Sequence, residues 1–303
     1  MDALEHVLQV VLLLALPPLL LGIINKVKAR FGGRRGPPLL QLYYDLAKLL
    51  RKGSVTSRTT TWVFVAGPAV TLVTVVFAGL LVPIGPADAP LHFAGDFVLL
   101  AYLLGLSRFF TASAALDTGS AFEGMGAARD VTFACFAEVT LFFSFLAVGA
   151  LSRASSLSPM LGPLAPEVAV IATAPLVLVV AAMAIVLLAE TARVPVDDPN
   201  THLELTMIHE VMVLDHGGPA LGVILYGASV KLFILAALIV RLVLPEVDPR
   251  ALGWLLFLGL VVVVAVAIGV IESVMARLRM RSVPALLVAS CLLAGFGFLL
   301  VVT

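Results

Sequence analysis

Eight apolar runs, each about as long as the hydrocarbon layer of a bilayer, determine what this chain can fold into. A helix needs about 20 largely apolar residues to cross a membrane. The chain is 61% hydrophobic and 13% charged, with a mean hydropathy of +1.12, which is typical of a polytopic membrane protein and excludes a water-exposed fold. We expect an all-α protein in which residues 1–303 form one integral membrane domain, with eight transmembrane helices and amphipathic helices on the cytoplasmic side. The predicted spans are 3–25, 62–84, 96–116, 131–151, 167–189, 219–244, 251–273 and 283–302.

Lysine and arginine are distributed unevenly between the loops. The loops after the first, third, fifth and seventh spans hold 14 of the 19 basic residues, and the other three loops hold two. Basic loops stay on the cytoplasmic side of a membrane. We therefore expect the loops at 26–61 and 190–218 to face the cytoplasm and both termini to lie on the outer face.

Several classes of binding site are disfavoured. The formal net charge is zero, which gives no electrostatic basis for binding nucleic acid. Cys135 and Cys291 lie in separate apolar runs, without the spacing of ligands for a zinc ion or an iron–sulfur cluster. His209 and Glu210 would need a histidine at position 213 to complete a zinc protease motif, and that residue is Val213. We expect no metal, no cofactor and no catalytic residue in this chain.

Two cytoplasmic loops have distinct patterns. In the first, a basic, glycine-rich turn at 26–36 precedes apolar residues at helical spacing between positions 39 and 50, which predicts an amphipathic helix on the membrane surface. The loop at 117–130 contains three glycines but follows no strand, so a dinucleotide-binding motif is not supported. We expect this loop to be a turn exposed to a partner.

Ionisable residues lie within or at the ends of several spans. They are Glu138 in the fourth span, Glu190 at the end of the fifth, Lys231 in the sixth and Glu272 at the end of the seventh. Each one alone could be a snorkelling side chain or part of a static ion pair. As a set they favour a polar path through the protein interior, because charges in lipid are costly.

The loop at 190–218 contains a dense run of ionisable residues, with six acids, three histidines and one arginine. Thr201 and Glu204 have the spacing of a capping box, which predicts a helix from about 201 to 216. His202, Thr206, His209 and Glu210 would share one side of this helix. Buried acids next to histidines suit protonation coupling, because burial and nearby charge shift pKa values in opposite directions.

Four motifs give the chain a resemblance to a known family over nearly its whole length. The chain resembles the membrane-arm subunit of respiratory complex I, called subunit 1 or H, which is shared with energy-converting membrane-bound nickel–iron hydrogenases of the formate hydrogenlyase and hydrogenase 4 types. The motifs are Leu-Leu-Gln-Leu-Tyr-Tyr-Asp-Leu-Ala-Lys-Leu-Leu at 39–50, Gly-Ala-Ala-Arg at 126–129 leading to Ala-Glu-Val at 137–139, Ala-Glu-Thr-Ala-Arg-Val-Pro-Val-Asp at 189–197, and Glu-Ser-Val-Met-Ala-Arg-Leu-Arg at 272–279.

The resemblance implies a subunit of the prokaryotic cytoplasmic membrane that joins a cytoplasmic redox arm to antiporter-like membrane subunits. It also implies that iron–sulfur clusters and a nickel–iron centre belong to partner subunits. Together with the ionisable residues described above, it gives an expected ion path of Glu138, Glu190, Arg193, Asp197, Asp198, Glu204, His209, Glu210, Lys231 and Glu272. The expected interface with the redox arm comprises Asp45, Lys48, Arg129, Arg277 and Arg279.

The chain departs from the complex I pattern after Arg193. Val196 replaces a phenylalanine, and Asn200 and His202 replace two glutamates. This version resembles the hydrogenase branch, in which electrons pass to protons in a partner subunit and not to quinone. A quinone-site subunit of a complex I-like enzyme is the alternative, and a stand-alone transporter is a third hypothesis, although no internal repeat supports it.

Overall fold

Helices form all the regular secondary structure of the residues that the computed structural model describes, which are 2–162, 166–197, 207–245 and 247–302. The predicted all-α fold is confirmed. The helices are α1 (Asp2–Ala15), α2 (Pro17–Phe31), α3 (Gln41–Leu50), α4 (Trp62–Leu80), α5 (Asp96–Asp117), α6 (Ala121–Ser152), α7 (Leu157–Met160), α8 (Pro166–Glu190), α9 (Gly218–Val243), α10 (Arg250–Val274) and α11 (Val283–Val302), with 3-10 turns η1 (Glu210–Val213) and η2 (Met280–Ser282).

Seven segments of the described chain are long and apolar enough to cross a membrane, and a bent pair of helices forms an eighth. The bent pair is α1 and α2, which meet at an angle of 48°. The predicted first span at 3–25 falls on this pair, in which Pro17 and Pro18 interrupt the helix after Ala15. The other seven predicted spans each coincide with a helix, including the third, which contains Arg108.

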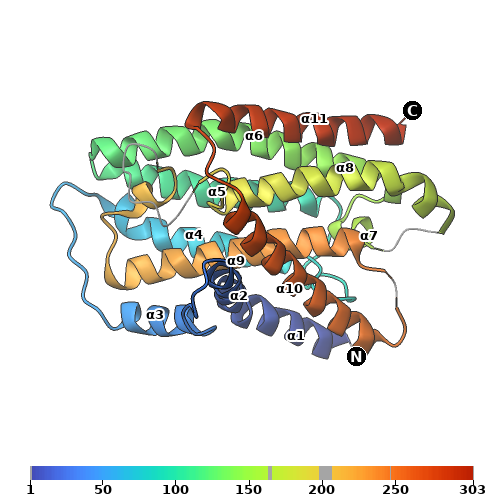
Figure 1. Cartoon of the computed structure of the whole chain (residues 1–303), viewed down its shortest axis with the longest axis horizontal. Coiled ribbons are helices and arrows are strands. Elements are labelled where there is room, and N and C mark those ends of the chain that lie inside the picture. The colour runs from blue at the N-terminus through green and yellow to red at the C-terminus, as the bar shows by residue number, and fades with distance from the viewer. Residues whose placement is uncertain (1, 163–165, 198–206, 246, 303) are drawn as a thin grey trace.

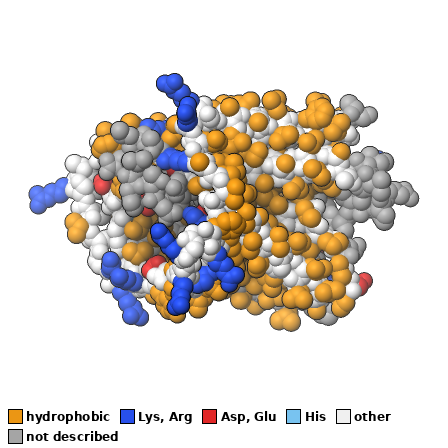
Figure 2. All heavy atoms as spheres, viewed as in Figure 1, with side chains coloured by type: hydrophobic (Ala, Val, Ile, Leu, Met, Phe, Trp, Pro, Cys, Tyr) orange, Lys and Arg blue, Asp and Glu red, His pale blue; other side chains and the backbone are white. Residues whose placement is uncertain are grey.

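The long helices form a bundle whose two ends differ in charge. Most of them run side by side, while α10 crosses the bundle obliquely, packed on α2 and α9 (Figure 1). Both termini lie at one end, and α3 lies at the opposite end. Figure 2 shows lysine and arginine side chains gathered at the end that carries α3, and apolar side chains covering most of the remaining surface in this view. The chain is a multi-pass membrane protein.

The predicted loop at 117–130 is mostly helical. Helix α6 begins at Ala121, so the prediction of an exposed turn is wrong for 121–130. The reason is a close contact at Gly126, where a Cβ atom would lie 2.3 Å from Cγ1 of Val211. The glycine there allows two segments to pack together, which the sequence pattern did not distinguish from a turn.

The predicted helix at 201–216 is wrong in its described part. Residues 201–206, and with them the proposed capping box, lie outside the described residues, whereas 207–216 contain only the 3-10 turn η1. The backbone N–H groups of Ile208 and His209 donate to Oδ2 of Asp197, at 3.2 and 3.1 Å. Because these donors bind a side chain, they are not available for an α-helical ladder.

Candidate functional site

Arg108 of α5 is the centre of a buried group of charges. Its guanidinium donates hydrogen bonds to Glu138 of α6 and Glu190 of α8, and its Nε lies 3.7 Å from Oδ2 of Asp130, also on α6. The Arg108 side chain is only 8% exposed. Three carboxylates from two helices therefore offset the cost of burying one guanidinium.

Glu190 has a second cationic partner. Nζ of Lys231 on α9 lies 2.6 Å from Oε2 of Glu190, while Arg108 binds the other oxygen. Glu190 of α8 therefore links Arg108 of α5 to Lys231 of α9. A buried carboxylate with two cations is held in its ionised form by their charge.

His209 joins this group to the loop before α9. Its Nε2 lies 3.1 Å from Oδ1 of Asp130, and its Nδ1 lies 3.5 Å from Oδ2 of Asp197. Burial disfavours the charged imidazole, but the two carboxylates outweigh this effect and raise the pKa of His209 to about 9. The imidazole is therefore charged at neutral pH.

Asp197 fixes the loop from both sides. Besides the two backbone N–H groups described above, it binds Nη2 of Arg277, 2.9 Å from Oδ1. Burial alone would raise the pKa of Asp197, but the hydrogen bond to His209 and the charge of Arg277 hold that pKa below its usual range. The N–H of Leu278 also donates to the carbonyl of Pro195, at 2.9 Å, so the segment after α8 is bound to the segment after α10.

A second, smaller group of charges lies near the C-terminal ends of α2 and α10. Glu272 of α10 binds Nζ of Lys28 at 2.7 Å and Nη1 of Arg193 at 3.1 Å. Its side chain is fully buried. These contacts hold Arg193, in the segment that follows α8, against α2 and α10.

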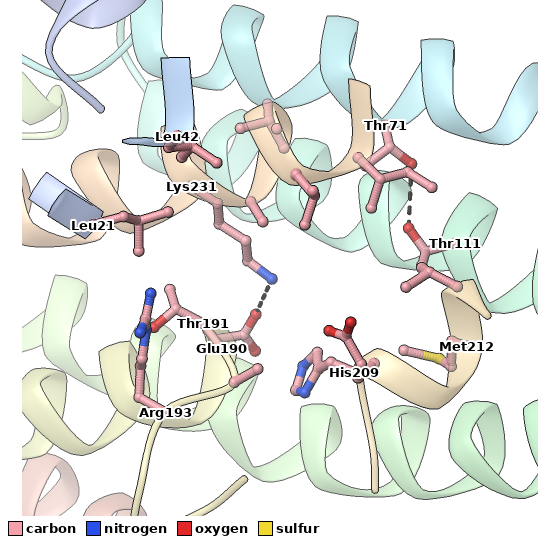
Figure 3. A pocket seen from close by; sticks show the side chains of 18 of the residues that line it. Leu21, Leu42, Thr71, Thr111, Glu190, Thr191, Arg193, His209, Met212 and Lys231 are labelled. Atoms are coloured by element: carbon pink, nitrogen blue, oxygen red, sulfur yellow. Dashed lines mark hydrogen bonds and ion pairs between the residues drawn. The ribbon is translucent and has the colours of Figure 1, made fainter. Parts of the chain in front are cut away.

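A cavity of about 350 Å³ is open to both groups. Its polar side carries Arg108, Asp130, Glu190, Arg193 and Lys231. Figure 3 shows Lys231 bonded to Glu190, His209 pointing into the space, and the bonded pair of Thr71 and Thr111 along another wall. The opposite side, which we call the apolar wall, is formed by Leu21, Gly22, Leu42, Ile224 and Leu225.

The paired charges around Arg108 balance when His209 is protonated. The carboxylates are Glu138, Glu190, Asp130 and Asp197, and the permanent cations paired with them are Arg108, Lys231 and Arg277. With an imidazolium at 209 the two signs are equal in number. Loss of that proton leaves one uncompensated negative charge beside the cavity, so protonation of one residue changes the field that an ion in the cavity meets.

The structure brings most of the predicted ion-path residues together. Glu138, Glu190, Asp197, His209 and Lys231 lie in the larger group, and Arg193 and Glu272 form the smaller one. Glu210 lines the cavity. Asp198 and Glu204 lie outside the described residues. Their common role as an ion path stays a prediction.

The predicted interface residues divide into two kinds. Arg129 and Arg277 make internal contacts, since Arg129 donates to the carbonyl of Met207 at 3.0 Å and Arg277 binds Asp197. Asp45 lines the cavity and accepts a hydrogen bond from Gln41. Lys48 and Arg279 are exposed, as contact with a partner requires.

Sequence reasoning missed three members of the two groups. Arg108 lies within the predicted third span, Asp130 in the predicted loop at 117–130, and Lys28 in the basic turn at 26–36. An arginine within an apolar run was the available signal, because such a charge needs a partner at the same depth.

Comparison with known proteins places the chain in a family. Residues 4–303 match the family described as NADH dehydrogenase. The chain belongs to this family. Formate hydrogenlyase subunit 4 of Escherichia coli (strain K12) is 30% identical over 98% of this chain and 96% of its own length. Hydrogenase-4 component C of the same organism is 31% identical over 78% of this chain and 74% of its own length.

A solved structure shows the same fold. One chain of the membrane-bound sulfane sulfur reductase, an archaeal respiratory membrane complex, superposes with a TM-score of 0.80 over 99% of both chains, at 21% identity. The predicted resemblance to the complex I subunit and its hydrogenase relatives is therefore confirmed. This member of the NADH dehydrogenase family is a membrane subunit of a respiratory-type redox complex.

Proposed function

We propose that this subunit couples electron transfer in a cytoplasmic nickel–iron hydrogenase arm to movement of H⁺ or Na⁺ through the membrane arm. The observation that carries the proposal is the continuous series of ion pairs from Glu138, within α6, through Arg108, Asp130 and His209 to Asp197 in the cytoplasmic loop. Such a series can transmit a change of charge from the redox side into the membrane, because each group is held by the charge of the next.

Glu138 offers the sharpest test of the ion path. Its side chain is 45% exposed, far more than that of Glu190 or Asp130, so Glu138→Gln disturbs packing least. In the purified complex in proteoliposomes we expect this variant to keep its redox rate within about two-fold and to lose at least about ten-fold in ion uptake per electron. Glu5→Gln is the control, because Glu5 lies in α1 and pairs with Arg250, outside the group of charges around Arg108. Full coupling in the Glu138 variant would exclude the path.

The proposed partners follow from the relatives. Two of them are named as components of a formate hydrogenlyase and of hydrogenase-4. We therefore expect hydrogenase-like and iron–sulfur subunits, which carry the redox centres, to bind at the end that holds Lys48 and Arg279, and antiporter-like subunits to bind in the membrane. Purification of the tagged chain from its native membrane tests this. Co-purifying chains without nickel or iron–sulfur clusters would contradict the proposal.

A second candidate function is a quinone site, which the apolar wall of the cavity favours. A hydrophobic quinone tail fits a wall of leucine and isoleucine side chains, with the polar head toward the charged side. Reduction of a soluble quinone analogue by the complex, abolished by Leu42→Trp and retained in Leu50→Trp on the exposed face of α3, would establish this function. Quinone reduction unaffected by Leu42→Trp would exclude this cavity as the site.

We also propose that the chain lies in the prokaryotic cytoplasmic membrane with both termini outside. The gathering of basic side chains at the end away from the termini supports this orientation. A cysteine introduced at exposed Leu4 should react with an impermeant maleimide in intact cells, whereas one at Arg279 should not. The reverse labelling would invert the orientation.

A further inference from the structure

The first span is broken near its middle, and the break leaves backbone oxygens without donors from their own helix. Pro17 and Pro18 have no N–H group, so they cannot bond to the carbonyls of Leu13 and Leu14. The N–H of Leu19 donates to the carbonyl of Leu16, at 3.0 Å, and not to that of Ala15. In the hydrocarbon region, each backbone group left unpaired costs several kcal/mol.

Two tyrosine hydroxyls provide donors for two of these three carbonyls. Tyr226 of α9 donates to the carbonyl of Leu14 at 2.7 Å, and Tyr43 of α3 donates to that of Ala15. Burial raises the pKa of Tyr43, so its hydroxyl keeps the proton that it donates. Both carbonyls belong to exposed residues at the surface of the bundle, where the protein must provide the donors that lipid lacks.

The break lies next to the apolar wall of the cavity. Tyr43 follows Leu42 in the sequence and Tyr226 follows Leu225, and both leucines belong to that wall. Helix α2, which starts at the break, contributes Leu21 and Gly22. The two hydroxyls therefore join α3 and α9 to the end of α1, next to the start of α2 and beside the cavity.

Helix α2 is closely packed beyond the break. A Cβ atom at Gly22 would lie 2.0 Å from the carbonyl oxygen of Leu39, and one at Gly269 of α10 would lie 2.8 Å from Cβ of Val27. These contacts leave α2 little freedom to slide. Its direction therefore depends on the angle that is fixed at the break.

We propose that Tyr43 and Tyr226 are positioning residues that hold the first span bent and thereby set the width of the cavity at its apolar wall. Because Tyr43 is on the surface helix α3, displacement of α3 pulls on a backbone carbonyl within the membrane. The device links the cytoplasmic surface of the subunit to the shape of the cavity, whatever the cavity holds.

The first test measures access to the cavity in the complete complex. In a background in which Cys135 and Cys291 are serine, a cysteine at Leu21 reports access through its rate of labelling by a maleimide. Tyr43→Phe and Tyr226→Phe should each slow labelling about five-fold, the effect of one lost hydrogen bond. Tyr44→Phe is the matched control, because Tyr44 is 60% exposed and its hydroxyl bonds to neither carbonyl. Unchanged labelling in both phenylalanine variants overturns the proposal.

The second test removes the need for the hydroxyls. Pro17→Ala with Pro18→Ala returns N–H donors to the helix, so it should straighten the first span and lengthen the distance between spin labels at Leu4 and Arg30. In this background Tyr226→Phe should change neither the distance nor the labelling rate. If Tyr226→Phe has the same effect with and without the prolines, the tyrosine acts elsewhere and the proposal fails.

Discussion

Nε2 of His209 lies 3.1 Å from Oδ1 of Asp130, which joins the loop before α9 to the buried face of α6. Asp197 lies on the other side of the same imidazole. One titratable residue therefore connects the charges on the membrane-spanning helices with the charges in the loops that follow α8 and α10.

The packing of residues 207–216 should depend on pH through His209. Its pKa is raised to about 9 from the usual 6.5, so its stabilising contribution is complete below about pH 6.5 and is lost as the pH rises through 9. The contribution is on the order of 2–3 kcal/mol. Hydrogen–deuterium exchange of 207–216, corrected for the intrinsic rate, should increase over this interval in the wild type. His209→Gln should abolish the pH dependence, and His92→Gln in the loop between α4 and α5 should not.

Glu190 should be less replaceable than Lys231. Glu190→Gln leaves Arg108 and Lys231 close together without their shared carboxylate, and removal of one partner from a buried ion pair costs about 3–5 kcal/mol. Lys231→Met leaves Glu190 paired with Arg108, so its effect should be smaller. The thermal unfolding midpoint of the purified complex measures both. In the double variant, Lys231→Met should recover part of the stability that is lost in Glu190→Gln. Equal losses of stability in the two single variants would contradict this account.

A methyl group at Gly126 should displace η1. Its Cβ would lie 2.3 Å from Cγ1 of Val211 and 2.9 Å from the carbonyl oxygen of Ile208, so Gly126→Ala should destabilise by about 1–3 kcal/mol. Gly124→Ala, two residues earlier in the same helix, is a matched control, because its Cβ would meet only Cδ2 of Leu116, at 3.8 Å. The control should be neutral or more stable, since alanine favours helix. Equal stability of the two variants would show that the contact at Gly126 is not limiting.

Asp197→Asn should loosen the link between the segment after α8 and the segment after α10. The amide cannot balance the charge of Arg277 and binds the N–H groups of Ile208 and His209 less strongly. We expect trypsin to cleave after exposed Arg279 at least about ten-fold faster in the intact complex. Asp215→Asn is the control, because the Asp215 side chain is exposed. Equal cleavage in wild type and Asp197→Asn would mean that other contacts hold the loops.

The sequence determined the architecture because its dominant constraint is local. A run of about 20 apolar residues must span the membrane wherever it lies in the chain, so the spans, their even number and the location of both termini at one end follow from the pattern. The same reasoning identified Glu138, Glu190, Lys231 and Glu272 as candidate site residues, because a charge within or beside a span needs a partner.

Only the tertiary structure decided which partners those charges have. Arg108 meets Glu190 across 82 positions of sequence, and Tyr226 meets Leu14 across 212. Such contacts depend on how the helices are rotated and packed, and no local pattern encodes them. The same cause made the glycines of 117–130 look like a turn: Gly126 is in a helix, and its function is a close approach to a segment more than 80 residues away. The sequence by itself therefore determined what must be buried in this protein, and the packing of the helices decided which charges meet there.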